Sequence, residues 1–227
     1  MKNIVIIGAS RGIGREIAIQ ADRLGHNVFA FSRSLEKLDS LQEETTRVRV
    51  NSLDLLSKEL ENDLKNALED VANIDILINN AGLLVNKPFE ELTYTDFQNS
   101  YQVNLIGAMQ CTQFVLKKMS AGAHVVNISS MGGFQGTMKF PGLAAYSSSK
   151  AALASITELL AEEYKEKQIS FNCLALGAVQ TEMLEEAFPG YEAPLNPDEM
   201  AEYILDFSLN GNKYFNGKIL PVSSSTP

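Results

Sequence analysis

Short apolar runs recur along the chain, and stretches with helical periodicity separate them. Most runs are rich in β-branched residues, and their apolar residues stand at successive positions rather than alternate ones. The runs cover residues 4–7, 28–31, 48–50, 74–78, 124–128, 169–176 and 218–222. Continuous apolar strands are typical of a parallel sheet that is covered on both faces. The pattern therefore predicts a strand at each run.

Helical spacing is clearest directly after the first run. Apolar residues recur at this spacing between Ile13 and Leu24, and Gly25 follows where helices often end. Further helices are predicted at about 94–119, from near Ala145, and after Pro197, which suits a first helical turn. This alternation, with right-handed crossovers, predicts a doubly wound, Rossmann-like α/β fold: a mostly parallel seven-stranded sheet with helices on both faces.

Composition favours one compact domain. The chain has 227 residues, of which 45% are hydrophobic and 21% charged, and this excludes a disordered or fibrous protein. A domain of this size buries roughly 70–75% of the surface that its unfolded chain exposes, so its stability requires neither a metal nor a disulfide. No linker, repeat or low-complexity tract divides the chain, and we expect a single domain over residues 1–227.

Charge and cysteine content narrow the partners and the compartment. The chain carries 19 basic and 28 acidic residues, a net charge of −9, which disfavours nucleic acid and anionic membranes as partners. Cys111 and Cys173 provide neither a disulfide framework nor a metal-ligand spacing, so we expect a cytoplasmic protein without a metal site. The run 4–7 is too short for a signal peptide, and the longest uncharged stretch, 119–138, is too polar to cross a bilayer.

A glycine-rich loop follows the first predicted strand. Residues 8–14 read Gly-Ala-Ser-Arg-Gly-Ile-Gly and lead into the first helix. The loop departs from the G-x-G-x-x-G fingerprint because Ile17 stands where the third glycine would be, and no Lys-Ser or Lys-Thr makes it a P-loop. Three glycines in a loop are by themselves about as consistent with a structural turn as with a phosphate-binding loop. The loop's place at the carboxyl end of the first strand favours phosphate binding at a helix N-terminus.

Tyrosine and lysine stand four positions apart twice in the chain. Tyr214 and Lys218 span Asn216-Gly217, a turn dipeptide, so their side chains need not share a face. Tyr146 and Lys150 open a predicted helix, where residues four apart lie one above the other. An unperturbed phenol has a pKa of about 10, and a nearby ammonium draws that pKa toward neutral pH. Only the first pair is predicted to be an acid–base unit.

Together these motifs resemble a known family. Residues 8–14, Asn-Asn-Ala-Gly at 79–82, Asn104, Ser130 and Tyr-Ser-Ser-Ser-Lys at 146–150 are similar to the short-chain dehydrogenases/reductases of the classical type. The resemblance extends from residue 3 to about residue 222. It implies a dinucleotide-binding oxidoreductase that reduces a ketone or aldehyde to an alcohol, reversibly, by hydride transfer.

The resemblance also implies roles for individual residues. Tyr146 would be the proton donor, and Lys150 would lower its pKa and hold the cofactor's ribose. Ser130 would position the substrate oxygen, and Asn104 would anchor a water relay behind the lysine. Ser129 is the rival of Ser130, but it should point to the opposite side of the strand. Purely structural roles are the alternative: Ser130 could be a turn former, Asn104 a solvated surface amide, and Lys150 an exposed charge.

The end of the second strand indicates which nicotinamide cofactor binds. Family members that prefer NAD follow the general dinucleotide pattern, in which a carboxylate stands at the end of the second strand. In this chain Ser32 and Arg33 stand there instead, and Arg11 adds a second cation. This pattern is similar to the members that use NADP(H); the alternative is that both arginines are merely solvated. The full set of expected cofactor-binding residues is Gly8, Ser10, Arg11, Gly12, Ile13, Gly14, Ser32, Arg33, Asp54, Leu55, Asn80, Ala81, Gly82, Tyr146, Lys150, Gly177, Val179 and Thr181.

Several segments depart from the family pattern. Ile7 stands where a threonine is common, and Leu176 replaces a proline, which puts the stiffness of the following turn in doubt. Residues 131–145 form a longer segment than usual and are expected to wall the substrate pocket, while residues 182–189 are expected to form a mobile lid. The residues expected to make this pocket apolar are Phe134, Met138, Phe140, Leu143, Met183, Leu184 and Phe188.

Alternatives follow from the same motifs. The chain could sense NADP(H) as a regulator without turnover, although a sensor would not need Tyr146 and Lys150 together. An epimerase or dehydratase of the extended family is disfavoured because 227 residues leave no room for a separate substrate domain. The resemblance further implies a small-molecule substrate and a homodimer or homotetramer.

Overall fold

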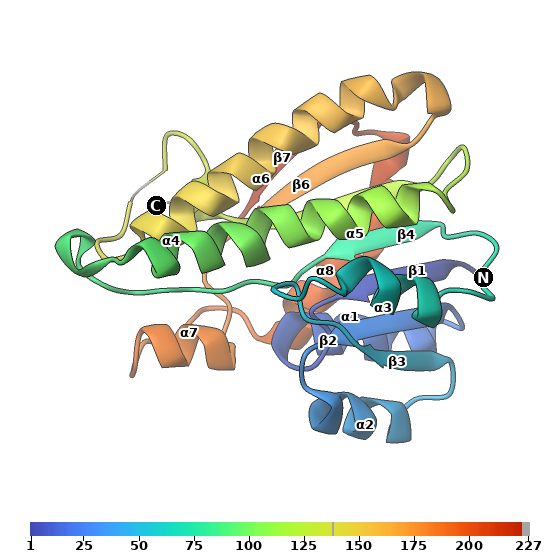
Figure 1. Ribbon diagram of the computed structural model, residues 1–227, viewed down its shortest axis with the longest axis horizontal. Coiled ribbons are helices and arrows are strands. Elements are labelled where there is room, and N and C mark those ends of the chain that lie inside the picture. Colours follow the sequence, from blue (N-terminus) through green and yellow to red (C-terminus); the bar gives the residue numbers. More distant parts are fainter. Residues whose placement is uncertain (138, 224–227) are drawn as a thin grey trace.

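The computed structural model describes residues 1–137 and 139–223 and contains one seven-stranded sheet (Figure 1). Every strand pair is parallel, and the strand order is β3-β2-β1-β4-β5-β6-β7. The strands are β1 (Asn3–Ile7), β2 (Asn27–Ser32), β3 (Val48–Ser52), β4 (Ile76–Asn79), β5 (His124–Ser130), β6 (Ser170–Leu176) and β7 (Lys218–Val222). Each apolar run of the sequence lies at one of these strands, so the predicted doubly wound fold is confirmed.

Helices cover both faces of the sheet. The helices are α1 (Gly12–Arg23), α2 (Leu35–Glu43), α3 (Leu60–Ala67), α4 (Tyr94–Tyr101), α5 (Gly107–Leu116), α6 (Ala144–Glu163), α7 (Glu182–Ala187) and α8 (Pro197–Asn210). One hydrophobic core lies between the sheet and α1, α2 and α8, and a second lies between the sheet and α3, α5 and α6 (Figure 1). The sheet is therefore buried on both faces, as its continuous apolar strands require.

The pattern predicted the long helices and missed the short ones. It predicted α1, α6 and α8, and the structure also confirms a glycine with positive φ after α1, at Gly25. Helix α2 buries only Leu38 and Leu41, and α3 buries only Leu60 and Leu64. Two buried leucines in a largely polar segment produce no apolar stripe long enough to predict a helix.

The helix predicted at about 94–119 is interrupted. A π-helical turn over Gln102–Ile106 separates α4 from α5. Such a turn adds a residue to the local helical repeat and is frequent at functional sites. It contains Asn104, whose side chain is buried.

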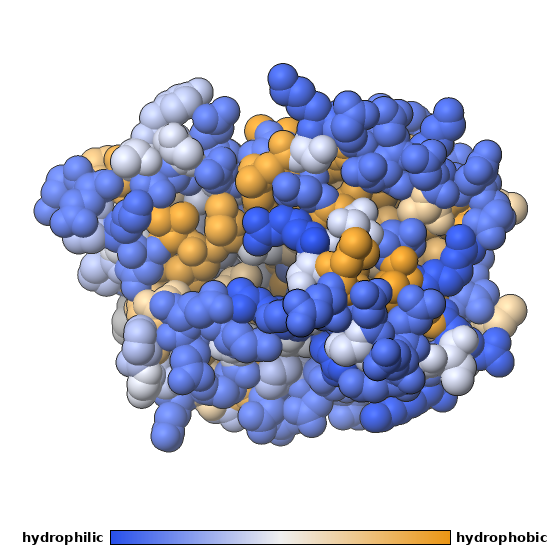
Figure 2. Space-filling model, turned by 60° about the horizontal axis from the view of Figure 1, so that its bottom comes forward, coloured by the Kyte–Doolittle hydropathy of each residue, from blue (hydrophilic) through white to orange (hydrophobic). Residues whose placement is uncertain are grey.

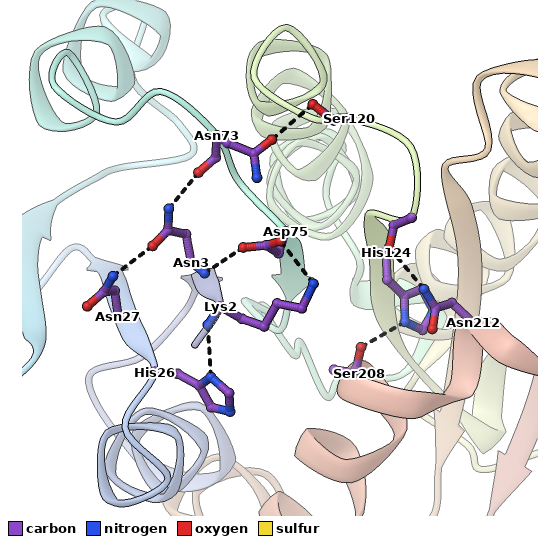
Figure 3. A network of polar contacts seen from close by, with 11 residues as sticks. Lys2, Asn3, His26, Asn27, Asn73, Asp75, Ser120, His124, Ser208 and Asn212 are labelled. Atoms are coloured by element: carbon purple, nitrogen blue, oxygen red, sulfur yellow. Dashed lines mark hydrogen bonds and ion pairs between the residues drawn. The ribbon is translucent and has the colours of Figure 1, made fainter.

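The amino ends of the strands carry a separate polar network (Figure 3). Asp75 accepts hydrogen bonds from the Lys2 ammonium at 3.0 Å and from the backbone N–H of Asn3 at 2.8 Å. The buried His124 contacts the carbonyl oxygen of Ser208 through Nδ1 at 3.0 Å, and burial lowers the pKa of its imidazole to about 4. Each of these polar groups has a hydrogen-bond partner within the protein, so the contacts at this end of the sheet stabilise the fold.

Two features of the described residues bear on membranes and metal ions. No helix among residues 1–137 and 139–223 is both long and apolar enough to cross a membrane. The same residues contain no group of three or more side chains that could together hold a metal ion.

Candidate active site

A cleft of about 460 Å³ lies at the carboxyl ends of the strands. It brings together nearly all of the site residues expected from the sequence. Those that line it are Gly8, Ser10, Arg11, Gly12, Ile13, Ser32, Arg33, Asp54, Leu55, Asn80, Ala81, Gly82, Ser130, Tyr146, Lys150, Gly177, Val179 and Thr181. Gly14 and Asn104 do not line the cleft; both lie behind it and support residues that do.

The glycine loop packs directly on the segment after β4. A Cβ atom at Gly8 would lie 2.6 Å from the backbone of Ala81, and Gly8 adopts a φ of +93°. A Cβ at Gly14 would lie 2.5 Å from the side-chain nitrogen of Asn80, which donates a hydrogen bond to the Gly8 carbonyl oxygen at 2.8 Å. Only glycine fits at these contacts without displacing the neighbouring backbone.

The loop leaves the start of α1 open toward the cleft. Arg11 is the N-cap residue of α1 and makes no side-chain capping bond, and the first turn contains no acidic residue. Unpaired N–H groups and the positive end of the helix dipole favour an anion at such a terminus. The loop therefore fits the diphosphate of a dinucleotide.

Hydroxyl groups and cations gather beside this loop. The Ser32 hydroxyl donates a hydrogen bond to the Ser10 hydroxyl at 2.7 Å. Arg33 is exposed at the cleft rim, and none of the ion pairs found among the described residues involves it. Strand β2 ends on the hydroxyl residue Ser32 rather than on a carboxylate.

The catalytic candidates line the same cleft. Tyr146 and Lys150 lie one turn apart in α6, and both line the cleft together with Ser130 at the end of β5. The Lys150 side chain is buried, and its Nζ donates a hydrogen bond to the Ile128 carbonyl oxygen at 2.8 Å. The Ser130 hydroxyl accepts a hydrogen bond from the Gly132 N–H at 3.2 Å.

Burial shifts the pKa values of this pair in opposite directions. It raises the pKa of the Tyr146 phenol above its usual value, and a hydrogen bond with Ser130 opposes part of that shift. It lowers the pKa of the Lys150 ammonium to about 8. The causes of the Tyr146 shift are its burial and its hydrogen bond with Ser130, so the expectation that Lys150 lowers the pKa of Tyr146 stays a prediction. A phenol that stays protonated at neutral pH is suited to donate a proton.

Both the oxygen and the nitrogen of the Asn104 side-chain amide form hydrogen bonds within the protein. Its Oδ1 accepts a hydrogen bond from the Leu83 N–H at 2.7 Å, and its Nδ2 donates to the Leu83 carbonyl oxygen at 3.0 Å and to the Ser149 hydroxyl at 2.9 Å. A Cβ atom at Gly82 would lie 3.6 Å from the Lys150 Nζ and 3.7 Å from the Asn104 Oδ1. Asn104 thus ties the loop after β4 to α6 beside the lysine, and its part in a water relay stays a prediction.

The neighbouring serines have different partners. The Ser129 hydroxyl is buried and donates to the Lys150 carbonyl oxygen at 2.9 Å. Ser130 instead stands beside the Tyr146 phenol. The hydroxyl of Ser129 is therefore committed to the helix backbone, and Ser130 is the better candidate to bind a substrate oxygen.

The turn after β6 is supported although Leu176 replaces a proline. Leu176 pairs with Val222 in the sheet, and the Gly177 N–H donates to the Val222 carbonyl oxygen at 2.8 Å. A Cβ at Gly177 would collide with the side chain of Ser223, so only glycine fits there. Farther along, the Thr181 hydroxyl caps α7 by accepting a hydrogen bond from the Leu184 N–H at 3.3 Å.

Much of the cleft lining is apolar. Phe140, Leu143, Met183, Leu184 and Phe188 line it as expected, whereas Phe134 does not, and Met138 lies outside the described residues. Met131 lines the cleft as part of the expected wall, residues 131–145, whereas the sequence prediction missed the apolar lining residues Leu83, Leu84, Val103 and Tyr191. The place of Leu83 and Leu84 directly after Asn-Asn-Ala-Gly is a signal that could have identified them. The space-filling view in Figure 2 shows apolar side chains in a recess bordered by hydrophilic ones.

Comparison with known proteins gives consistent matches. The family described as short chain dehydrogenase matches residues 2–192. The chain is 32% identical over 240 residues to the 3-oxoacyl-(acyl-carrier-protein) reductase FabG of Aquifex aeolicus, covering 96% of this chain and 94% of the relative. It is 33% identical over 182 residues to carbonyl reductase (NADPH) 2 of Sus scrofa, covering 79% of this chain and 72% of the relative. The solved structure of 4-hydroxyisoleucine dehydrogenase complexed with NADH is similar with a TM-score of 0.88 at 25% identity, covering 99% of this chain and 98% of that one.

Proposed function

Because the chain belongs to the short-chain dehydrogenase/reductase family and is an oxidoreductase, we propose that it reduces a ketone or aldehyde to an alcohol with NADPH, reversibly. The observation that carries the proposal is the cleft itself, where Ser130, Tyr146 and Lys150 face the glycine loop. We place the cofactor site and the catalytic site in one domain, residues 1–227.

The choice of NADPH rests on residues of this chain. The family uses nicotinamide cofactors, but relatives and structural neighbours are named with both forms, NADPH for the Sus scrofa reductase and NADH for the dehydrogenase complex. In this chain Ser10, Ser32 and Arg33 line the cleft where a 2′-phosphate would lie, and β2 ends on Ser32 rather than on a carboxylate. A guanidinium is always charged and matches phosphate geometry.

The proposed chemistry assigns one task to each side chain. When bound, the dihydronicotinamide supplies the hydride that reduces the carbonyl carbon. The Ser130 hydroxyl donates a hydrogen bond to the carbonyl oxygen, and the Tyr146 phenol donates its proton to that oxygen as negative charge develops. Lys150, still protonated below its pKa of about 8, stabilises the phenolate that remains. Asn104 positions the loop and the helix that frame this group.

The cleft favours an uncharged substrate with a hydrophobic body. Its lining includes Phe140, Leu143, Met183, Leu184 and Phe188, and apolar walls bind apolar groups. Removing apolar surface from water contributes to affinity in proportion to its area. Small, strongly hydrated carbonyl compounds are therefore expected to be poor substrates.

The assembly and the compartment are part of the same proposal. Family members commonly form oligomers, and we propose a homodimer or homotetramer, which light scattering of the purified chain tests. The low cysteine count and the net charge of −9 support a place in the cytoplasm.

The test compares NADPH with NADH across a panel of ketones and aldehydes. We expect kcat/KM to be higher with NADPH, and Arg33→Ala to reduce that preference about ten- to hundredfold, the range for losing a charge-assisted hydrogen bond. Arg23→Ala, which removes an exposed arginine at the end of α1, is the matched control and should leave the preference unchanged. Equal use of both cofactors by the wild type would contradict the NADPH assignment.

The same experiment separates the enzyme from a regulator. Binding of NADPH without oxidation by any member of a broad carbonyl panel would favour a catalytically silent sensor on this fold. We favour the enzyme because Tyr146 and Lys150 both line the cleft beside Ser130.

A further inference from the structure

Glu186 lies in the lid segment, residues 182–189, and forms an ion pair with Arg11. The Glu186 carboxylate of α7 forms a two-point ion pair with the Arg11 guanidinium, in which Nη1 pairs with Oε1 and Nη2 lies 3.1 Å from Oε2. The hydrogen bond lowers the pKa of Glu186 and raises that of Arg11. Arg11 belongs to the glycine loop, so this ion pair joins the lid segment to the first β–α turn.

Few other contacts position α7. None of its residues is fully buried, and its apolar side chains Met183 and Leu184 are only partly buried where they line the cleft. Its carboxyl end is held where the Asn86 side chain donates a hydrogen bond to the Ala187 carbonyl oxygen at 2.8 Å. A segment with so little buried surface depends strongly on its polar links. The Arg11–Glu186 pair is thus a main link between the lid segment and the cofactor side of the cleft.

The proposed function gives Arg11 a second partner. Arg11 lines the cleft with Ser10, Ser32 and Arg33, beside the expected place of a 2′-phosphate. A guanidinium whose fork already binds a carboxylate at two points cannot bind a phosphate with the same donors. The carboxylate and the phosphate therefore compete.

We propose that Glu186 is a positioning residue that competes with the cofactor's 2′-phosphate for Arg11, so that binding of a phosphorylated dinucleotide releases α7 from the glycine loop. The inference rests on the NADPH preference proposed above. NADH, which lacks this phosphate, would leave the ion pair in place. Glu186 therefore contributes to cofactor discrimination without touching the cofactor.

The size of the effect follows from exposure. The two side chains are 34% and 62% exposed, and solvent-exposed ion pairs change an equilibrium by about two- to fivefold. Glu186→Gln should therefore tighten binding of adenosine 2′,5′-bisphosphate by about two- to fivefold and leave binding of 5′-AMP unchanged. Calorimetric titration of the full chain at low ionic strength measures both.

A matched control separates competition from simple charge repulsion. Glu185 is the exposed neighbour of Glu186 on the same helix, and no ion pair found among the described residues includes it. Glu185→Gln removes the same charge and should leave binding unchanged. In an Arg11→Met background, Glu186→Gln should also have no effect, because the competed group is gone.

Hydrogen exchange gives a second readout that needs no turnover. In the ligand-free chain, Glu186→Gln should speed exchange of the backbone amides of α7, and Glu185→Gln should not. Adenosine 2′,5′-bisphosphate should speed exchange there in the wild type, whereas 5′-AMP should not.

The outcomes distinguish this inference from the proposed function. If the bisphosphate binds and Arg11→Met weakens it, but Glu186→Gln changes neither affinity nor exchange, the competition is refuted and the NADPH preference stands. Equal tightening by Glu185→Gln, or tightening that persists in Arg11→Met, also refutes it. If the bisphosphate binds no better than 5′-AMP, the NADPH preference fails and the competition fails with it.

Discussion

Two Tyr-x-x-x-Lys pairs with the same spacing lie in contrasting surroundings. Tyr146 and Lys150 occupy one face of α6 and line the cleft, and Lys150 is only 3% exposed. Tyr214 is 79% exposed, and Gly217, with a φ of +68°, turns the chain before Lys218 opens β7. The spacing places both groups on one surface only where the intervening residues are helical.

The buried pair also has shifted pKa values. Burial raises the pKa of the Tyr146 phenol and lowers that of the Lys150 ammonium to about 8. Perturbed pairs of this kind cluster at functional sites because the environment that shifts a pKa also prepares a group for proton transfer. A sequence motif therefore acquires chemical meaning from the burial that the fold gives it.

Removing each lysine should produce the largest difference between the pairs. Lys150→Met is expected to lower kcat for carbonyl reduction by about 10²–10⁴-fold, because the phenolate left after proton donation loses its stabilising charge. Lys218→Met should leave kcat unchanged. Steady-state kinetics with NADPH measures both, and circular dichroism checks that both variants are folded. A fully active Lys150→Met enzyme would remove the distinction between the pairs.

The pH dependence should report Lys150 alone. With a pKa of about 8, its ammonium is present below that pH and is lost above it, so kcat for reduction should fall about tenfold between pH 7 and pH 9. Unfolding does not explain such a fall. The folded pKa lies below the ordinary lysine value of 10.5, so this group binds fewer protons in the folded state, and its contribution to stability rises with pH over that window. A flat profile would contradict the role of the ammonium.

A smaller effect is expected from substituting Asn104, which positions the loop and the helix beside Tyr146 and Lys150. Asn104→Ala removes hydrogen bonds to the backbone of Leu83 and to Ser149 and should cost about 1–3 kcal/mol of stability, with a several-fold loss of kcat. Urea unfolding and kinetics give the two values. Gln98→Ala, at an exposed position of α4, is the control and should change neither. If Asn104→Ala left the free energy of unfolding unaltered, these hydrogen bonds would not stabilise the fold as proposed.

The smallest effect should come from the exposed tyrosine. Tyr214→Phe is expected to change the free energy of unfolding by less than about 0.5 kcal/mol and to leave kcat unchanged, since the phenol is exposed and does not line the cleft. Denaturant titration and the NADPH assay measure this. A clear loss of activity would assign a function to the second pair.

Much of the fold was predictable because the strands are continuous apolar runs and α1, α6 and α8 bury regular stripes. The π-helical turn at Gln102–Ile106 was not, since it leaves no mark on hydrophobic spacing. The cleft residues were predictable because motifs at successive strand ends must meet at one edge of a parallel sheet. The Arg11–Glu186 ion pair joins residues 175 positions apart, and the rise in the pKa of Tyr146 depends on burial, so neither could be derived from local spacing.

The most direct test follows a single turnover in Tyr146→Phe. Enzyme saturated with NADPH is mixed with a reducible ketone, and the loss of dihydronicotinamide absorbance is recorded beside the wild type and Tyr214→Phe. The account predicts unchanged NADPH affinity and a reduction step slowed by about 10²–10⁴-fold in Tyr146→Phe only. A wild-type rate in Tyr146→Phe would contradict the assignment of this phenol as the proton donor.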